Sequence, residues 1–318
     1  MAKILITRAL PEAVYDAARA LGDVDIRDQT IPMTAGELRG ALAIYDVILP
    51  TLGDVISAEM LADFDQPRAR LLANFGVGYN HIDVDACRAK GVAVTNTPGA
   101  VTDATADIAM TLILMSCRRA GEGERMVRAE QWEGWAPTQM LGQHVSGKTV
   151  GLIGMGRIGK AIARRCHFGF GMDVVFFNRS QVADLDVPAT QVPDLETLAS
   201  QADILVAAVP GGAATRHIVN AQVFAAMKPT AHFVNIARGD VVDEAALIEA
   251  LQTGAIAGAG LDVYEFEPKV PATLRALENV TLLPHLGTAA LEVREAMGLM
   301  AVDNIRAHLA GKVPPNLV

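Results

Sequence analysis

Three glycines near the middle of the chain have the spacing Gly154-x-Gly156-x-x-Gly159. An apolar run precedes them and a helical pattern follows, which is the context that this spacing requires. The first glycine allows a tight turn, the second lets the backbone approach a ligand, and the third permits close packing of helix on strand. Because the N-terminus of a helix attracts anions, the pattern predicts a site for the pyrophosphate of a dinucleotide.

Two further residues have types that suit the reduction of a carbonyl group. Arg238 follows an apolar run, and its fork of donors suits a carboxylate. His285 follows another apolar run and a proline, and imidazolium is the side chain best able to give a proton near neutral pH. Two acids, Glu265 and Glu267, lie in the sequence between them. Taken alone, the same sequence is also consistent with Arg238 as a surface arginine, His285 as a structural histidine, and the two glutamates as part of a solvated loop.

The elements that position these residues alternate between short apolar runs and helical patterns, which is typical of open parallel sheets. In the first block we expect a helix from residue 11 and strands at residues 3–7, 24–27, 47–49, 71–75 and 92–95. A largely helical stretch at residues 102–128 separates this block from the second. There we expect six strands, at residues 150–153, 173–177, 204–209, 232–236, 259–263 and 280–283. A helical pattern at residues 287–309 then returns to pack on the first block.

The composition excludes several classes of protein. The chain has 318 residues, which is enough for two domains, and 51% hydrophobic with 20% charged residues argues against disorder. Its net charge of −9 gives no general attraction to nucleic acid or anionic membrane, and no apolar run is long enough to span a bilayer. Cys87, Cys117 and Cys166 lack CxxC spacing, so we expect no disulfide framework, no metal site and a cytoplasmic location.

Four more motifs surround the glycine fingerprint: Asn74-Phe-Gly-Val-Gly-Tyr-Asn-His-Ile-Asp83, Asn235-Ile-Ala-Arg-Gly239, Gly260-Leu-Asp-Val-Tyr-Glu-Phe-Glu-Pro268 and Leu283-Pro-His-Leu-Gly287. Together they resemble the D-isomer-specific 2-hydroxyacid dehydrogenases, and most of all the glyoxylate and hydroxypyruvate reductase branch. The resemblance covers nearly the whole chain. It implies α/β architecture with two doubly wound parallel-sheet domains and the chemistry in a cleft between them.

The same resemblance implies domain boundaries. The substrate domain, flavodoxin-like, would comprise residues 1–99 and 287–318. The Rossmann cofactor domain would comprise residues 100–286, including a dimerisation arm at residues 100–145.

The resemblance also implies a role for each motif residue. Arg238 would bind the substrate, His285 would be the general acid, and Glu267 would fix the histidine tautomer and favour imidazolium. The backbone N–H groups of Val77 and Gly78 would hold the substrate carboxylate. Besides the fingerprint glycines, the cofactor contacts that it implies are Thr105, Arg157, Ile158, Pro210, Ile236, Asp262 and Gly287. For Asp262, hydrogen bonding to a turn is an alternative.

The residues that follow the second strand of the dinucleotide fold indicate which nicotinamide is used. An NAD-selective site carries an acid about 20 residues past the fingerprint, where it bonds the ribose 2′-hydroxyl. Here Asn178 is uncharged, while Arg179 and Ser180 offer a cation and a hydroxyl to a 2′-phosphate. We therefore expect NADPH to be preferred, with NADH also accepted if Arg179 faces solvent.

The expected function is the NADPH-dependent reduction of a small 2-oxo acid, glyoxylate or hydroxypyruvate, by a homodimer. Two alternatives stay open. One is an NAD-dependent D-2-hydroxyacid dehydrogenase with another substrate, since formate, phosphoglycerate and phosphite dehydrogenases share the scaffold. The other is a nucleotide-sensing relative that is not an enzyme.

Overall fold

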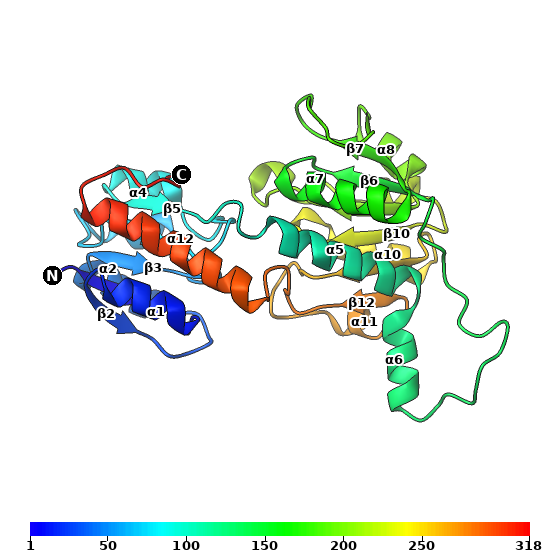
Figure 1. The fold of residues 1–318 in the computed structure, drawn as a ribbon, viewed down its shortest axis with the longest axis horizontal. Helices are drawn as coiled ribbons and strands as arrows, with labels where there is room; N and C mark the ends of the chain where they lie inside the picture. The colour runs from blue at the N-terminus through cyan, green and yellow to red at the C-terminus, as the bar shows by residue number, and fades with distance from the viewer. The chain divides into compact units, whose positions relative to one another are not determined.

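The computed structural model describes residues 1–318, and these divide into two compact units. Unit 1 comprises residues 1–101 and 288–318, and unit 2 comprises residues 102–287. Each unit has a parallel sheet with helices on its faces (Figure 1). The expectation of two doubly wound parallel sheets is confirmed.

The sheet of unit 1 has five strands in the order β2-β1-β3-β4-β5, all parallel. This is the flavodoxin-like order. The central strands are buried along their whole length, as a sheet covered on both faces requires. The five strands are β1 (Lys3–Ile6), β2 (Asp23–Ile26), β3 (Val47–Leu49), β4 (Leu71–Ala73) and β5 (Ala93–Thr95).

Five helices belong to unit 1: α1 (Glu12–Arg19), α2 (Ala35–Ile44), α3 (Ala58–Ala62), α4 (Val84–Ala89) and α12 (Leu291–Leu309). The last helix is far from the others in sequence but packs against α1 and β4. Gly298 makes this approach close, because a Cβ there would lie 2.2 Å from Cγ2 of Val14. The helical pattern at the end of the chain therefore completes the layer that begins with α1.

The sheet of unit 2 has seven parallel strands in the order β12-β11-β10-β9-β6-β7-β8. Six correspond to the expected strands, and β8, of two residues, was not expected because so short a strand has no hydrophobic pattern. The strands are β6 (Thr149–Ile153), β7 (Asp173–Phe177), β8 (Thr190–Gln191), β9 (Ile204–Ala207), β10 (His232–Asn235), β11 (Gly258–Leu261) and β12 (Val280–Leu282). The chain changes direction across the sheet between β6 and β9, where such folds bind ligands.

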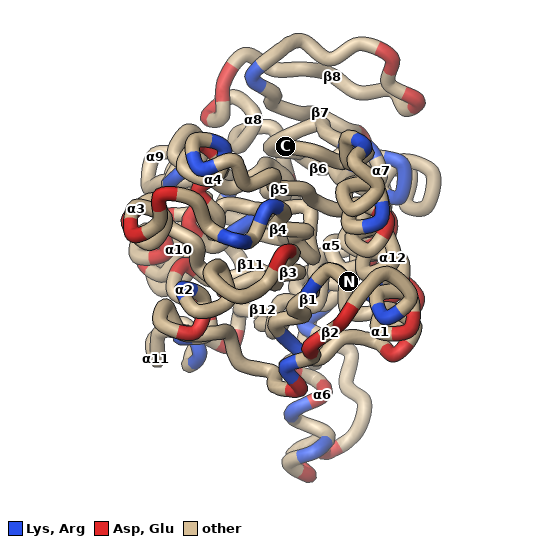
Figure 2. The backbone as a smooth tube through the Cα atoms, turned by 90° about the vertical axis from the view of Figure 1, so that its left-hand side faces the viewer, with Lys and Arg blue, Asp and Glu red and all other residues tan.

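The stretch expected to be helical over residues 102–128 forms two helices, α5 (Thr102–Cys117) and α6 (Ala120–Arg128). They separate at Arg119, which has a left-handed backbone with φ of 54°. The longer helix, α5, packs on β10 and β11, whereas α6 buries no residue and carries acidic and basic side chains (Figure 2). The remaining helices of unit 2 are α7 (Arg157–Arg164), α8 (Leu195–Gln201), α9 (Ala221–Ala226), α10 (Glu244–Gln252) and α11 (Ala272–Arg275).

Candidate active site

The glycine fingerprint forms the turn between β6 and α7. Gly154 has φ of 98°, and a Cβ there would lie 2.9 Å from the carbonyl oxygen of Ala208. A Cβ on Gly159 would lie 2.2 Å from the carbonyl oxygen of Gly154, so the helix packs closely on the turn. Each of these two positions therefore admits glycine alone.

The same turn fits a pyrophosphate. Gly156 is the N-cap of α7 and has no side chain to cap the first N–H groups of the helix. A Cβ on Gly156 would meet nothing within 4 Å, so its backbone faces open space. Arg157 is exposed and Ile158 half-buried in the first turn that follows. Free N–H groups at a helix N-terminus are the usual site for such an anion.

Asn178, Arg179 and Ser180 follow β7, beside the fingerprint. The amide oxygen of Asn178 accepts a hydrogen bond from the N–H of Met155, at 3.3 Å, inside the glycine turn. Its amide nitrogen donates to the carbonyl oxygen of Ser180 at 2.9 Å. Arg179 and Ser180 are both exposed. The residues that we expect to discriminate between NADPH and NADH therefore lie next to the fingerprint, and Arg179 and Ser180 among them are open to solvent.

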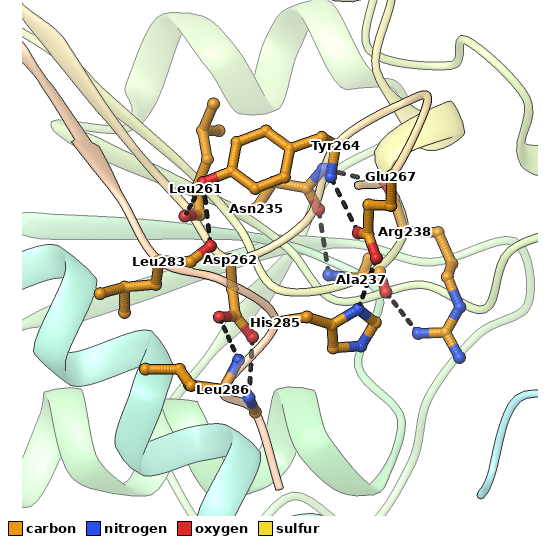
Figure 3. Close-up of polar contacts among 11 residues, drawn as sticks. Asn235, Ala237, Arg238, Leu261, Asp262, Tyr264, Glu267, Leu283, His285 and Leu286 are labelled. Atoms are coloured by element: carbon orange, nitrogen blue, oxygen red, sulfur yellow. Dashed lines mark hydrogen bonds and ion pairs between the residues drawn. The ribbon is translucent and has the colours of Figure 1, made fainter. Parts of the chain in front are cut away.

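Arg238, Glu267 and His285 follow β10, β11 and β12 along the chain. These strands are neighbours in one parallel sheet, so their carboxyl ends lie at the same edge. Figure 3 shows the three side chains gathered there. The structure thus brings together the residues whose roles the sequence resemblance implies.

Glu267 and His285 are in direct contact. Oε2 of Glu267 lies 2.8 Å from Nδ1 of His285, and its Oε1 accepts from the N–H of Tyr264 at 3.0 Å. Burial by itself raises the pKa of Glu267, but the hydrogen bond and charge of His285 outweigh it. With smaller contributions from the Tyr264 N–H and the Arg238 charge, they hold the pKa of this carboxyl below its usual value. Glu267 is therefore a carboxylate, and the histidine nitrogen that stays free is Nε2.

Arg238 lies in a tight, largely buried position beside this pair. Burial lowers its pKa, and the charges of Glu267 and Asp240 raise it in part. One guanidinium nitrogen donates to the carbonyl oxygen of Ala237 at 2.7 Å, while the buried Nε has no hydrogen-bond partner in the protein. A Cβ on Gly211 would lie 2.7 Å from Cγ of Arg238, so a larger residue there would displace the arginine. A guanidinium with an unsatisfied donor suits an anionic ligand.

Asp262, Gly287 and Thr105 meet at one point of unit 2. The two carboxylate oxygens of Asp262 accept from the N–H groups of Leu286, at 2.6 Å, and Gly287, at 2.8 Å. The hydroxyl of Thr105 donates to the carbonyl oxygen of Gly287 at 3.1 Å. Asp262 thus holds the turn that presents His285, which is the alternative role considered for it from sequence.

The remaining two expected contacts also follow strands of unit 2. Ile236 is buried directly after β10, and Pro210 is exposed after β9. The carbonyl oxygen of Pro210 accepts a hydrogen bond from the hydroxyl of Thr215 at 2.7 Å.

Val77 and Gly78 belong to a loop after β4 of unit 1. Buried Asn74 donates to the carbonyl oxygens of Gly76 and Gly78, each at 3.1 Å. The amide of Asn96 donates to the carbonyl oxygen of Val77 at 2.9 Å. Two asparagines therefore hold the carbonyl groups of this loop, which fixes the direction of its N–H groups.

Sequence reasoning did not find several residues that position the site. The amide of Asn235 donates to the carbonyl oxygen of Arg238 at 2.9 Å. The hydroxyl of Tyr264 donates to the carbonyl oxygen of Leu283 at 2.9 Å. Both residues lie inside motifs quoted from the sequence, so their motif membership was the available signal. Their partners are set by the fold and cannot be read from spacing.

Some findings concern the rest of the molecule. No group of three or more His, Cys, Asp or Glu side chains is arranged to hold a metal ion. None of the helices combines the length and apolar character needed to cross a bilayer. All three cysteines are free and buried, and burial raises the pKa of each thiol to about 12.

The parallel seven-stranded sheet, the glycine turn and the Arg, Glu and His side chains at its edge define a dinucleotide-dependent oxidoreductase. Comparison with known proteins gives the family. The model of the D-isomer specific 2-hydroxyacid dehydrogenase, NAD binding domain, matches residues 110–287. The chain belongs to this family and is an NAD(P)-dependent oxidoreductase.

The similarity to individual relatives extends over the whole chain. A glyoxylate reductase from Thermococcus gammatolerans is 42% identical, over 99% of this chain and 95% of its own. Among solved structures, a protein from Thermus thermophilus has a TM-score of 0.91 and 38% identity, over 99% of each chain. The NADPH-dependent glyoxylate/hydroxypyruvate reductase from Sinorhizobium meliloti, in complex with NADP and malonate, has a TM-score of 0.88 and 35% identity. That match covers 100% of this chain and 96% of the other.

Proposed function

We propose that the protein is an NADPH-preferring reductase of small 2-oxo acids, with glyoxylate or hydroxypyruvate as substrate and the 2-hydroxy acid as product. The observation that carries this proposal is the contact of 2.8 Å between Glu267 and His285 at the sheet edge that also bears Arg238. The names of the relatives from Thermococcus gammatolerans and Sinorhizobium meliloti support the choice of substrate.

In this proposal Arg238 binds the carboxylate and the carbonyl oxygen of the 2-oxo acid. Its unsatisfied Nε and its largely buried position favour an anionic partner. The N–H groups of Val77 and Gly78 would also bind a substrate carboxylate, since hydrogen bonds from Asn74 and Asn96 fix the carbonyl groups of their loop. The guanidinium thereby stabilises the negative charge that develops on the carbonyl oxygen of the substrate during the reduction.

His285 supplies the proton. Because Nδ1 is engaged by Glu267, Nε2 carries the proton that passes to the carbonyl oxygen. The carboxylate of Glu267 holds the ring in one orientation through its contact with Nδ1. In the reverse direction the neutral Nε2 takes the hydroxyl proton, so the same pair serves oxidation.

The bound reduced nicotinamide supplies the hydride in this reaction. Unit 2 would hold it, with Arg179 and Ser180 meeting the 2′-phosphate and Asn178 ordering that turn. The residues that would bind the rest of the cofactor are Thr105, Gly154, Gly156, Arg157, Ile158, Gly159, Pro210, Ile236, Asp262 and Gly287. The open backbone at Gly156 supports this arrangement.

We further propose that the protein is a homodimer and that residues 100–145 form its dimerisation arm. Within unit 2, α6 and the segment after it extend away from the sheet (Figure 1). This arm exposes large apolar side chains, among them Trp132 at 55% and Trp135 at 81%. Aromatic side chains exposed in this way are common in the buried centre of interfaces.

Steady-state loss of reduced-nicotinamide absorbance tests the function. Glyoxylate and hydroxypyruvate are each assayed with NADPH and with NADH. We expect turnover with both acids and a higher kcat/KM with NADPH. A kcat/KM with NADH that equals or exceeds the value with NADPH would overturn the cofactor preference. No turnover with any combination of acid and cofactor, despite tight cofactor binding, would overturn the substrate assignment.

A further inference from the structure

Strand β8 lies at the edge of the unit 2 sheet, next to β7. Thr190 and Gln191 are its only residues, and they pair with Val175 and Phe176. The polar turn that begins with Asn178 therefore lies between the end of β7 and the start of this short strand.

The side chain of Gln191 makes three hydrogen bonds to this turn. Its Nε2 donates to the carbonyl oxygens of Asn178, at 3.2 Å, and Ser180, at 3.1 Å. Its Oε1 accepts from the N–H of Val182 at 3.1 Å. A primary amide has two donor hydrogens and an acceptor oxygen, so one side chain satisfies all three groups.

These hydrogen bonds hold the backbone on both sides of Arg179. The two carbonyl groups that Gln191 holds belong to the residues on either side of it, and Asn178 is also tied to the glycine turn through Met155. The side chain of Arg179 itself stays exposed. Gln191 thus fixes the backbone of the turn while leaving the guanidinium free for a ligand.

We propose that Gln191 is a specificity-determining positioning residue for the cofactor. Its amide keeps the turn of residues 178–182 in the conformation in which Arg179 and Ser180 together meet the 2′-phosphate of NADPH. NADH has no such phosphate and gains nothing from the ordered turn. This inference rests on the proposed NADPH preference.

The test compares the affinity of the full-length protein for NADPH and NADH by isothermal titration calorimetry. Gln191→Met keeps the length of the side chain and removes all three hydrogen bonds. We expect the Kd for NADPH to rise about tenfold, as the loss of one or two net hydrogen bonds predicts, while the Kd for NADH changes less than about twofold. Gln222→Met is the matched control, because Gln222 is exposed on α9 and its side chain makes no hydrogen bond.

A second variant keeps the test decisive if the methionine variant folds poorly. Gln191→Leu also removes the three hydrogen bonds and adds no charge, so we expect a similar loss of NADPH affinity. Thermal melts of all variants identify any loss of folded protein.

The outcomes separate the two proposals. If the wild type binds NADPH no tighter than NADH, the proposed preference fails and this inference fails with it. If the wild type prefers NADPH but Gln191→Met leaves the ratio of the two Kd values unchanged, the preference stands and the role of Gln191 is overturned. If Gln191→Met raised the Kd values for NADPH and NADH by the same factor, Gln191 would only stabilise the turn, and its role in cofactor specificity would be overturned.

Discussion

At the scale of single residues, the proposed proton transfer by His285 can be tested with one substitution. Replacing the histidine with alanine removes the proposed proton donor and changes no residue of the fingerprint turn. We expect kcat to fall by about a thousandfold, within the usual range for general acid catalysis, with an almost unchanged Kd for NADPH. Stopped-flow or steady-state rates and calorimetric binding measure the two quantities.

Gln222→Ala is the control for this variant, because Gln222 is exposed on α9 of the same unit and lies outside the proposed arm. This control should keep full activity. If His285→Ala loses cofactor affinity as much as turnover, its role as the acid is wrong and the residue supports binding instead.

A second histidine makes the stability of the protein depend on pH. His232 is 7% exposed, and its Nδ1 lies 2.7 Å from the hydroxyl of Ser116. Burial lowers its pKa from 6.5 to about 4, so the folded state keeps the ring neutral where the unfolded state protonates it. Its contribution to the free energy of unfolding is present above pH 6.5 and is lost as the pH falls to 4, by up to about 3 kcal/mol.

Urea denaturation of the wild type and of His232→Gln at steps between pH 4 and 7 measures this contribution. Glutamine does not titrate, so the variant should lose stability less steeply on acidification. Carboxyl groups titrate equally in both proteins and cancel in the difference. Parallel curves would show that His232 is protonated in the folded state as well.

The types of the site residues were readable from sequence, but their partners were not. Glu265 and Glu267 look equivalent in the sequence, and only the family motif selected the second. In the structure Glu265 pairs with Nε2 of His217 at 2.8 Å, whereas Glu267 pairs with His285. Which glutamate meets His285 depends on how the neighbouring loops close, and no local sequence pattern encodes it.

At the scale of elements, the contact between α1 and α12 depends on a glycine. Gly298→Ala places a methyl group 2.2 Å from Cγ2 of Val14, so we expect the free energy of unfolding to fall by about 1–3 kcal/mol. Gly40→Ala is the matched control, because Gly40 lies in α2 and a Cβ there meets nothing within 4 Å. That variant should gain up to about 1 kcal/mol from higher helix propensity.

Chemical denaturation of the two variants beside the wild type measures both changes. Equal stability of Gly298→Ala and the wild type would mean that α12 moves away from α1 without cost. The close packing of these two helices would then contribute little to unit 1.

Most elements were predictable because parallel strands buried on both faces are continuous apolar runs. Two features were not. The strand β8 has only two residues, and its place depends on pairing with β7. The break between α5 and α6 falls at Arg119, a residue type that gives no stop signal.

At the scale of the whole molecule, the proposed homodimer leads to a direct measurement. Changing Trp132 and Trp135 together to serine removes two exposed indoles from the arm, so we expect the dimer mass seen by light scattering to shift to that of a monomer. Ile31→Ser is the control, since Ile31 is 62% exposed in unit 1. A monomeric wild type, or a variant that stays dimeric at micromolar concentration, would contradict the assignment of the arm.

The division into two units was foreseeable because the fingerprint lies near the middle of the chain, so that the preceding half needs a sheet of its own. The end of the chain was harder to assign. The helical pattern at residues 287–309 correctly predicted a return to the first block, but the partners of α12 there follow from a close contact with Val14 that no local pattern encodes.

The insertion of unit 2 into unit 1 has a consequence for the growing polypeptide. During synthesis the first 101 residues leave the ribosome with no α12 to cover α1 and β4. They also lack the bridge between Thr95 and Leu317. All seven strands of unit 2 are made before the last part of unit 1, so the sheet of unit 1 lacks α12 while they are synthesised. Unit 1 can therefore close only after residues 288–318 have left the ribosome, and until then the surface that α12 covers is open to a chaperone.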